Sequence, residues 1–232
     1  MNDLVHDELR GTNPEGEALK GVTRWLSIHD DLLRGLTHTL SNRVGTIAAA
    51  AYMVELQPAS LATSAAALRA ESETLEALLR LFRMLPRRVR SVGEPVIPTD
   101  AANSAIELYG HHPHHPITPV IVVVDGDVQP AYVEPEALAM AIVVGLDAAS
   151  RTGAHRTSAT SAQQLEITIS CSTDWVTVHV TARDGAIDTD VTDDVAAISW
   201  LLSPFNGHGA PHALGASLMI PTLQAARRAQ RG

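Results

Sequence analysis

The sequence predicts an α+β protein in which a two-helix hairpin precedes a sandwich of helices and a mixed sheet. Two observations lead to this prediction. Residues 18 to 85 hold two long stretches with helical spacing of apolar residues, interrupted at Pro58. Alternation of apolar and polar residues, which is typical of strands, occurs only after residue 97. We expect a disordered N-terminus over residues 1–17, a hairpin over 18–90 and an α+β domain over 97–232.

The first predicted helix spans about residues 18 to 56 and carries an apolar stripe along one side. The stripe comprises Leu33, Leu36, Leu40, Val44, Ile47, Ala51 and Val54. The second predicted helix runs from about Ser60 to Leu85, where Pro86 ends it. Its stripe comprises Leu61, Ala65, Leu68, Ser72, Leu75, Leu79 and Phe82. Two such helices with a short connection form an antiparallel hairpin.

A single hairpin offers too little partner surface to bury both stripes. Two hairpins from two chains would bury them in a four-helix bundle, so we expect a homodimer. The alternative is that the hairpin packs on the C-terminal domain of its own chain.

Shorter segments build the C-terminal domain. The patterns predict helices over about 101–109, 134–149 and 195–202, a buried strand at "VIVVVD", a short strand at "PAYV", and two strands over 165–171 and 176–182 joined as a hairpin. A Gly-rich stretch follows, and the last predicted helix covers about Ala216 to Ala229. Such an order of elements places helices on one face of a mixed sheet.

Composition narrows the class of function. The net charge is −9 and no basic stripe is visible, which argues against nucleic acid and anionic membranes as partners. The longest apolar run, Ala137 to Leu146, is too short to cross a bilayer, and the N-terminus lacks a signal-peptide pattern. The single cysteine, Cys171, excludes an internal disulfide and a cysteine-rich zinc site. We therefore expect a soluble cytoplasmic protein.

His38 is the residue whose position most favours a chemical role. It lies two positions from the stripe residues Leu36 and Leu40, about 200° away around the helix axis, so it points away from the core. Asn42 follows one turn later on the same side. A neutral imidazole held outward is a nucleophile that suits phosphoryl transfer with a partner's carboxylate. The alternative is an ordinary exposed histidine.

The stretch "HTLSNRVGTI", residues 38 to 47, resembles the phospho-acceptor box of bacterial two-component histidine kinases. The box reads His, an acidic residue, Leu, any residue, Asn or Thr, Pro, Leu, two further residues and Ile; it is matched by His38, Leu40, Asn42, Val44 and Ile47. The resemblance implies that His38 accepts phosphate and that Asn42 orients a water for dephosphorylation of a partner. Thr39 stands where the family has a carboxylate that assists proton transfer, and Arg43 replaces the usual proline.

A second histidine–acid pair, His29-Asp30 in "HDDLLRGL", resembles the box of another kinase subgroup, and it makes His29 the alternative phospho-acceptor. His29 lies one turn before Leu33, close to the apolar stripe. Arg34 and Arg43 flank His38, and we expect them to help dock the acidic pocket of a receiver domain.

The C-terminal domain resembles the ATP-binding domain of the same family, with its binding residues largely replaced. Asp147 stands for one of two magnesium-binding asparagines in one register of "ALAMAIVVGLDAAS", and for neither in the other. Asp184 and Gly185 mark the position of the adenine-binding Asp-x-Gly-x-Gly motif, with the aspartate one residue out of place. Gly215 remains from the phosphate loop, as a residual anion site or part of a linker. The family's two closing strands are expected to be absent. The resemblance therefore implies a degenerate domain that binds no ATP.

No metal site is expected. The histidines of "HHPHHP", His111, His112, His114 and His115, have no acidic or cysteine partner nearby, so a metal site there is the weaker alternative. The acidic stretch Asp188 to Asp194 lacks the glycine and glutamate of a calcium loop, and we expect a solvated turn and helix cap.

The resemblance favours a histidine phosphotransfer protein. A homodimer would carry phosphate on His38 to or from aspartates of response-regulator receiver domains, with magnesium supplied by the receiver. Two alternatives stay open: a scaffold that sequesters a regulator without phosphoryl chemistry, and a working histidine kinase with a divergent ATP site.

Overall fold

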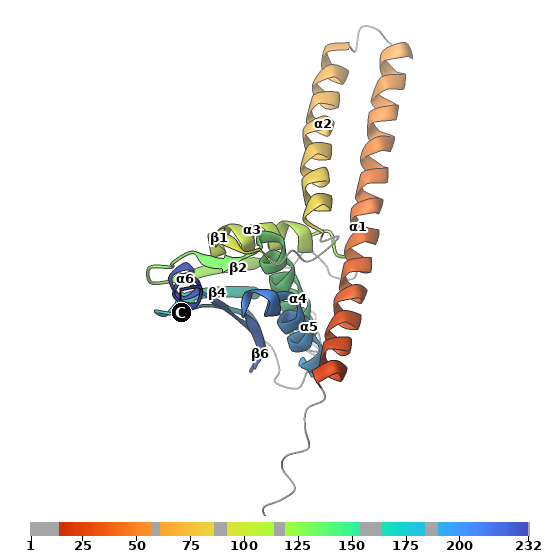
Figure 1. Ribbon diagram of the computed structural model, residues 1–232. Helices are drawn as coiled ribbons and strands as arrows, with labels where there is room; N and C mark the ends of the chain where they lie inside the picture. The colour runs from red at the N-terminus through yellow and green to blue at the C-terminus, as the bar shows by residue number, and fades with distance from the viewer. Residues whose placement is uncertain are drawn as a thin grey trace, which may run out of the picture.

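Two long helices, α1 (Pro14–Leu56) and α2 (Leu61–Met84), form an antiparallel hairpin that projects from an α+β body (Figure 1). The computed structural model describes residues 14–56, 61–85, 92–113, 119–153, 164–183 and 190–231. The body consists of β1 (Glu94–Val96), α3 (Pro98–Tyr109), β2 (Val120–Asp125), β3 (Ala131–Val133), α4 (Pro135–Gly153), β4 (Leu165–Cys171), β5 (Trp175–Ala182), α5 (Thr192–Leu202), the 3₁₀ turn η2 (Ser203–Phe205), β6 (His208–His212), β7 (Gly215–Pro221) and α6 (Leu223–Ala229).

Five strands form one mixed sheet in the order β2-β4-β5-β7-β6. β2 pairs with β4 in parallel, and the other neighbours are antiparallel. β1 and β3 form a separate antiparallel pair. α3, α4 and α5 cover one face of the sheet (Figure 1). This arrangement confirms the predicted α+β class, with helices on one face of a mixed sheet.

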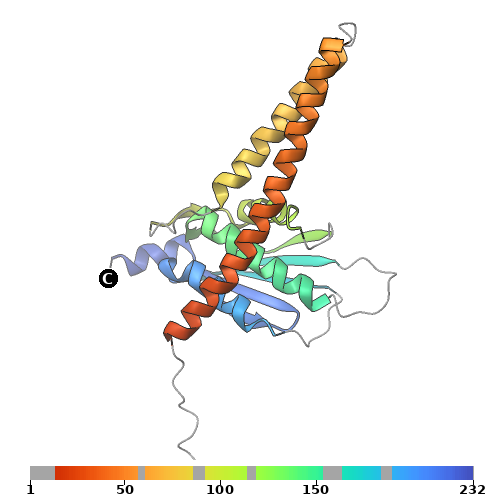
Figure 2. The same cartoon turned by 90° about the vertical axis from the view of Figure 1, so that its right-hand side faces the viewer.

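The core lies between that sheet and α4. The alternating residues of the three central strands point inward, and all are buried: Leu165, Ile167, Ile169, Val176, Val178, Val180, Ala216, Leu218 and Ile220. α4 is buried from Ala137 to Ser150 on every side, because α3 and α5 pack along it and α1 crosses it on the side away from the sheet (Figure 2). A helix that is apolar all round is typical of such a central position.

α1 uses its two halves for different partners. Its N-terminal half lies across α5 of the body, and its C-terminal half pairs with α2 (Figure 2). The residues buried against the body are Gly21, Trp25, Ile28, Leu32 and Leu36. A β-carbon at Gly21 would lie 2.5 Å from the carbonyl oxygen of Ala196, so glycine permits the close approach of the two helices. For the N-terminal half of α1, the alternative prediction is correct: this half packs on the C-terminal domain of its own chain.

The C-terminal half of α1 and α2 form the free part of the hairpin. Arg43 contacts Glu71 at 3.1 Å and helps set the antiparallel register. The predicted stripes divide between two environments. Half-buried positions are Leu40, Ile47, Val54, Leu68, Leu75 and Phe82, whereas Val44, Ala51, Ala65, Ser72 and Leu79 are exposed. The hairpin therefore leaves part of both stripes without cover in a single chain.

The end of the chain differs from the prediction. The helix expected from Ala216 is wrong over residues 216–221, which form β7, and β6 lies in the Gly-rich stretch. An apolar run such as "ASLMI" fits a buried strand and a buried helix equally well by periodicity. Pro221 cannot continue a helix that begins at Ala216, which favours the strand. The two closing strands are therefore present, contrary to expectation, and only α6 is helical.

Three smaller differences concern burial and boundaries. "VIVVVD" forms a strand as predicted, but at the sheet edge with its last three residues exposed, so the expected burial is wrong. β1 lies between the predicted hairpin, which was expected to end at residue 90, and the α+β domain, which was expected to begin at residue 97. α1 begins at Pro14 rather than near residue 18, and residues 1–13 lie outside the described ranges. None of the described helices combines the length and apolarity that a membrane span requires.

Candidate functional site

His38 lies on α1 in the part of the helix that pairs with α2, and its side chain is exposed. The outward orientation predicted from the helical spacing agrees with this position. Asn42 is also exposed, and its Nδ2 lies 3.4 Å from Nδ1 of His38. The two side chains therefore form a small polar pair on the surface of the hairpin.

The contact with Asn42 bears on the tautomer of the His38 imidazole. The oxygen and nitrogen of an asparagine amide exchange places by a half-turn of the amide. With Oδ1 toward His38, the amide accepts the Nδ1–H, and Nε2 carries the free lone pair. Asn42 can thus hold His38 in the form whose Nε2 is a nucleophile.

Thr39 and the two arginines make other contacts. The Thr39 hydroxyl donates to the Gly35 carbonyl oxygen at 3.0 Å and lies 3.4 Å from Nδ1 of His111. Arg34 contacts Asp31 at 3.0 Å, and Arg43 contacts Glu71 in α2. Each arginine therefore has a carboxylate partner of its own, and Thr39 faces the body rather than a partner protein.

His29 lies in a more enclosed position than His38. Its ring meets the edge of the buried Trp25 at a centroid distance of 5.5 Å, and its Nδ1 lies 3.7 Å from Oδ1 of Asp30. The side chain of His29 is 21% exposed. The histidine–acid pair is intact, but the imidazole is held against the core side of α1. Accessibility favours His38.

His111 and His112 serve the contact between α1 and the body. A side chain at Gly35 would clash with the His111 carbonyl oxygen, so α1 approaches the segment closely there. His112 is buried, and its Nε2 lies 3.8 Å from Oδ2 of Asp31. Burial lowers the pKa of His111, although Glu107 acts in the opposite direction. These two histidines therefore have a structural role, while His114 and His115 lie outside the described residues.

Asp147, which stands at the expected degenerate magnesium-binding position, belongs to a ring of ion pairs. Arg24 of α1 and Arg151 of α4 each contact both Asp147 of α4 and Asp194 of α5. Arg24 Nε lies 2.7 Å from Asp194, and Arg151 lies 3.2 Å from Asp147 and 2.5 Å from Asp194. The two aspartates are only 3% and 1% exposed. Asp147 is thus committed to arginines rather than available to a metal.

This ring corrects the expectation of a solvated acidic turn. The Asp190 carboxylate accepts the backbone N–H of Thr192 at 2.9 Å, but the N-cap position of α5 is Val191, which makes no side-chain cap hydrogen bond. Asp194, however, is buried in the ring together with Asp147, Arg24 and Arg151. Burial lowers the pKa of Arg151, but attraction to Asp194 and Asp147 outweighs this effect and raises it. The ion pairs of these four residues bind α1 to the body.

The remaining residues of the expected nucleotide site do not complete it. Asp184 and Gly185 lie outside the described residues. Gly215 is the first residue of β7, and a side chain there would clash with the Val180 carbonyl oxygen. Close packing of two strands thus explains this glycine. Beside the ring lies a cavity of about 250 Å³ lined by Arg24, Arg151, Asp190, Asp193 and Asp194. The three carboxylates outnumber the two arginines, and both arginines are already paired within the ring, which disfavours a polyanionic ligand.

The described residues contain no cluster of three or more histidine, cysteine, aspartate or glutamate side chains arranged to hold a metal ion. Sequence reasoning missed the role of Arg24, whose partners lie 123 and 170 positions away. One signal was present: Gly21, Trp25, Ile28, Leu32 and Leu36 form a second stripe at helical spacing. This stripe predicts a separate partner for the N-terminal half of α1.

Comparisons with known proteins give similarities in structure only. No protein-family model matches the sequence, and no curated protein matches it. Three similar solved structures are histidine kinases. AdeS of Acinetobacter baumannii is 11% identical with a TM-score of 0.42, covering 80% of this chain and 96% of that chain. Full-length ShkA in complex with AMPPNP is 13% identical with a TM-score of 0.42, covering 83% of this chain and 45% of that chain.

The mycobacterial sensor histidine kinase MprB is 13% identical with a TM-score of 0.40, covering 56% of this chain and 97% of that chain. Similarities at this level do not establish function. The functional assignment therefore rests on the residues and contacts of the chain.

Proposed function

We propose that the protein is a histidine phosphotransfer protein, in which His38 carries a phosphoryl group to or from an aspartate of a receiver domain. The observation that carries the proposal is the exposed His38–Asn42 pair on the free part of the hairpin. It combines a nucleophile, an amide whose oxygen can accept the Nδ1–H, and open access for a partner.

The transfer step balances without a nucleotide. The Nε2 lone pair of His38 attacks the phosphorus of an aspartyl phosphate in the partner, and an N–P bond forms. The P–O bond to the aspartate breaks, and the carboxylate leaves. With its amide turned so that Oδ1 faces the ring, Asn42 accepts the Nδ1–H during attack and so positions the imidazole. The reverse step returns the phosphoryl group to a receiver aspartate.

Radiolabelled phosphate on a receiver domain provides the test of this function. After incubation with the phosphorylated receiver, the chain should carry label that is lost in acid, as expected for a phosphohistidine. A scaffold would bind the receiver and acquire no label. A working kinase would instead acquire label from ATP alone.

The absence of ATP binding is part of the proposal. Asp147 is held by two arginines, and α1 crosses the helices α4 and α5 beside it. A chelated magnesium triphosphate requires oxygen ligands that are free to reach the ion. The arginines that line the neighbouring cavity, Arg24 and Arg151, are already paired with Asp194 and so offer little to the phosphates.

We expect calorimetric titration with ATP and magnesium to give no saturable heat at nucleotide concentrations up to about 1 mM, a standard free energy near −4 kcal/mol. An ATP-binding kinase domain titrated under the same conditions is the positive control. Saturable binding that disappears when magnesium is chelated would contradict this prediction and favour the kinase alternative.

A homodimer through the hairpin is the second part of the proposal. The free part of the hairpin exposes large apolar side chains, among them Val44 at 53% and Leu79 at 48%. Both belong to the predicted stripes. A second hairpin laid against these side chains would cover them and complete a four-helix bundle.

Replacing both Val44 and Leu79 by glutamate should convert the dimer into a monomer, because the dimer would bury two charges per chain without partners. Light scattering at micromolar concentration measures the mass. Thr46→Glu is the control, since Thr46 lies about 200° from Val44 around the helix and should leave the dimer intact. A monomeric wild type, or a dimer in the double variant, would contradict the proposed interface.

A further inference from the structure

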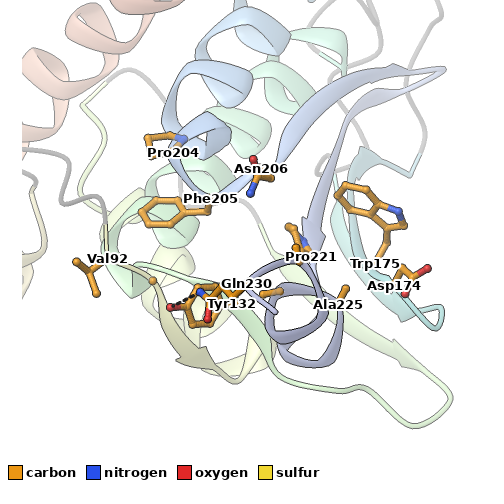
Figure 3. Close-up of a pocket in the computed structure, with 13 residues that line it drawn as sticks. Val92, Tyr132, Asp174, Trp175, Pro204, Phe205, Asn206, Pro221, Ala225 and Gln230 are labelled. Carbon is orange, nitrogen blue, oxygen red and sulfur yellow. Dashed lines mark hydrogen bonds between the residues drawn. The ribbon is translucent and has the colours of Figure 1, made fainter. Parts of the chain in front are cut away.

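A cavity of about 780 Å³ lies on the body away from the hairpin, between α6, η2 and the start of β5 (Figure 3). The sequence has only three tryptophans, three tyrosines and two phenylalanines, and one of each lines this cavity. Figure 3 shows Phe205 and Tyr132 on one side and Trp175 on the other. In a chain so poor in aromatic residues, this gathering of rings distinguishes the cavity from ordinary surface.

The walls of the cavity are fixed by hydrogen bonds between segments far apart in the sequence. The Thr222 N–H donates to the Asp174 carbonyl oxygen at 2.9 Å, which joins the β4–β5 turn to the start of α6. The Leu223 N–H donates to the Pro130 carbonyl oxygen at 2.9 Å, which joins α6 to the segment before Tyr132. A site with walls held in this way loses little conformational freedom when a ligand binds.

The polar groups of the lining define the kind of ligand. The carboxylate of Asp174 lies beside Trp175, and the Gln230 amide lies 3.5 Å from the Tyr132 hydroxyl. Asp174 pairs with Arg228, but the two side chains are 53% and 60% exposed, so the pair is weak and open to competition. Among the described residues that line the cavity, none is lysine or arginine.

Cations bind to the faces of aromatic rings and to carboxylates. The basic side chain that contacts the lining, Arg228, is already paired with Asp174, so an ammonium ligand would compete with Arg228 for this carboxylate. The chain's net charge of −9 also favours a cationic ligand. The volume is in the range of small-molecule sites. A flat apolar ring would contact the half-buried Trp175 and Tyr132 and the small exposed part of the buried Phe205, and an ammonium group would lie near Asp174.

This cavity is separate from the Arg24–Asp194 ring. Trp175, at the cavity, is the first residue of β5. The segment expected to have bound adenine follows the last residue of β5, and the two ends of this eight-residue strand are roughly 20 Å apart. Gly93 also lines the cavity, close to where the chain enters the body after α2. A β-carbon at Gly93 would lie 3.0 Å from the Tyr132 ring, so the entering chain packs directly on the wall.

We propose that this cavity is a binding site for small aromatic amines, in which the ring lies between Trp175, Tyr132 and Phe205 and the ammonium group is recognised by Asp174. The site would make the protein responsive to a small cationic metabolite. It is independent of phosphoryl chemistry on His38.

Calorimetric titration of the full chain with tryptamine, indole and indole-3-acetate tests the proposal, because the three probes share a ring and differ in charge. Tryptamine should bind saturably and at least about tenfold more tightly than indole-3-acetate, with indole between them. Saturable binding that favours the anion, or no saturable binding of tryptamine up to about 10 mM, would overturn the proposal.

Two variants on α6 locate the bound probe. Ala229→Phe places a ring inside the cavity and should weaken tryptamine binding by about tenfold or more. Gln224→Phe adds the same ring on the same helix, outside the cavity lining, and should change the affinity by less than about twofold. Asp174→Asn should remove the preference for tryptamine over indole while leaving the binding of indole. Equal losses in both phenylalanine variants, or an unchanged preference in Asp174→Asn, would overturn the assignment.

Discussion

His38→Ala is expected to abolish the uptake of phosphate from a phosphorylated receiver domain, with a loss of about 10³-fold or more, the scale on which removing a nucleophile acts. Alanine has no lone pair with which to form the N–P bond. The site is exposed, so the substitution should leave the fold and the dimer unchanged. The measurement is the rate at which acid-labile label appears on the chain after mixing with the labelled receiver.

His29→Ala is the matched control for this experiment. Both histidines lie on α1, but His29 meets Trp25 edge-on and belongs to the more enclosed side of the helix. We expect label uptake by His29→Ala within a few-fold of wild type. Loss of uptake in His29→Ala alone would move the phospho-acceptor to the upstream histidine. Binding of the receiver without any label on wild type would favour a scaffold.

The local geometry of the candidate site was predictable because it depends on neighbours in sequence. His38 and Asn42 are four residues apart, and helical spacing alone places them together and away from the apolar stripe. The same holds for the hairpin of β4 and β5, where period-two alternation separates the two faces of each strand. Features set within one element follow from the pattern of that element.

The end of the chain was mispredicted because its pattern is ambiguous in isolation. β7 lies inside the sheet between β5 and β6, so its residues "ASLMI" are almost all apolar and show no alternation. Only its pairing with β5 identifies β7 as a strand. In this pairing Trp175 lies opposite Pro221, and Thr181 lies opposite Gly215. That pairing joins segments between which α5, η2 and β6 lie in the chain, and local periodicity contains no information about it.

The ion-pair ring was unpredictable for a related reason. Arg24, Asp147 and Asp194 come from three helices, and each looks like an ordinary charged residue in its own helix. In the resemblance to kinases, Asp147 was considered only as a metal ligand. The packing of α1 on the body brings Arg24 to the Asp147 carboxylate. This ion pair occupies the carboxylate that would otherwise be the candidate magnesium ligand.

Arg24→Ala is expected to lower the free energy of unfolding by about 3 kcal/mol or more, the scale for removing one partner from a buried ion pair. The substitution leaves Asp147 and Asp194 buried with Arg151 as the remaining arginine of the ring. Two buried carboxylates beside one guanidinium leave one negative charge uncompensated, which is costly where water is excluded. Urea denaturation followed by circular dichroism measures the loss.

Arg34→Ala is the matched control, because it removes the same side chain from the same helix. The Arg34–Asp31 pair lies at the surface, where its arginine is 65% exposed, so the expected loss is below about 1 kcal/mol. Similar losses in the two variants would show that the ring does not fasten α1 to the body. A double-mutant cycle of Arg24→Ala with Asp194→Ala then separates charge pairing from lost packing. If pairing dominates, Asp194→Ala should cost much less in the Arg24→Ala background than in wild type, because the excess carboxylate is removed together with its partner.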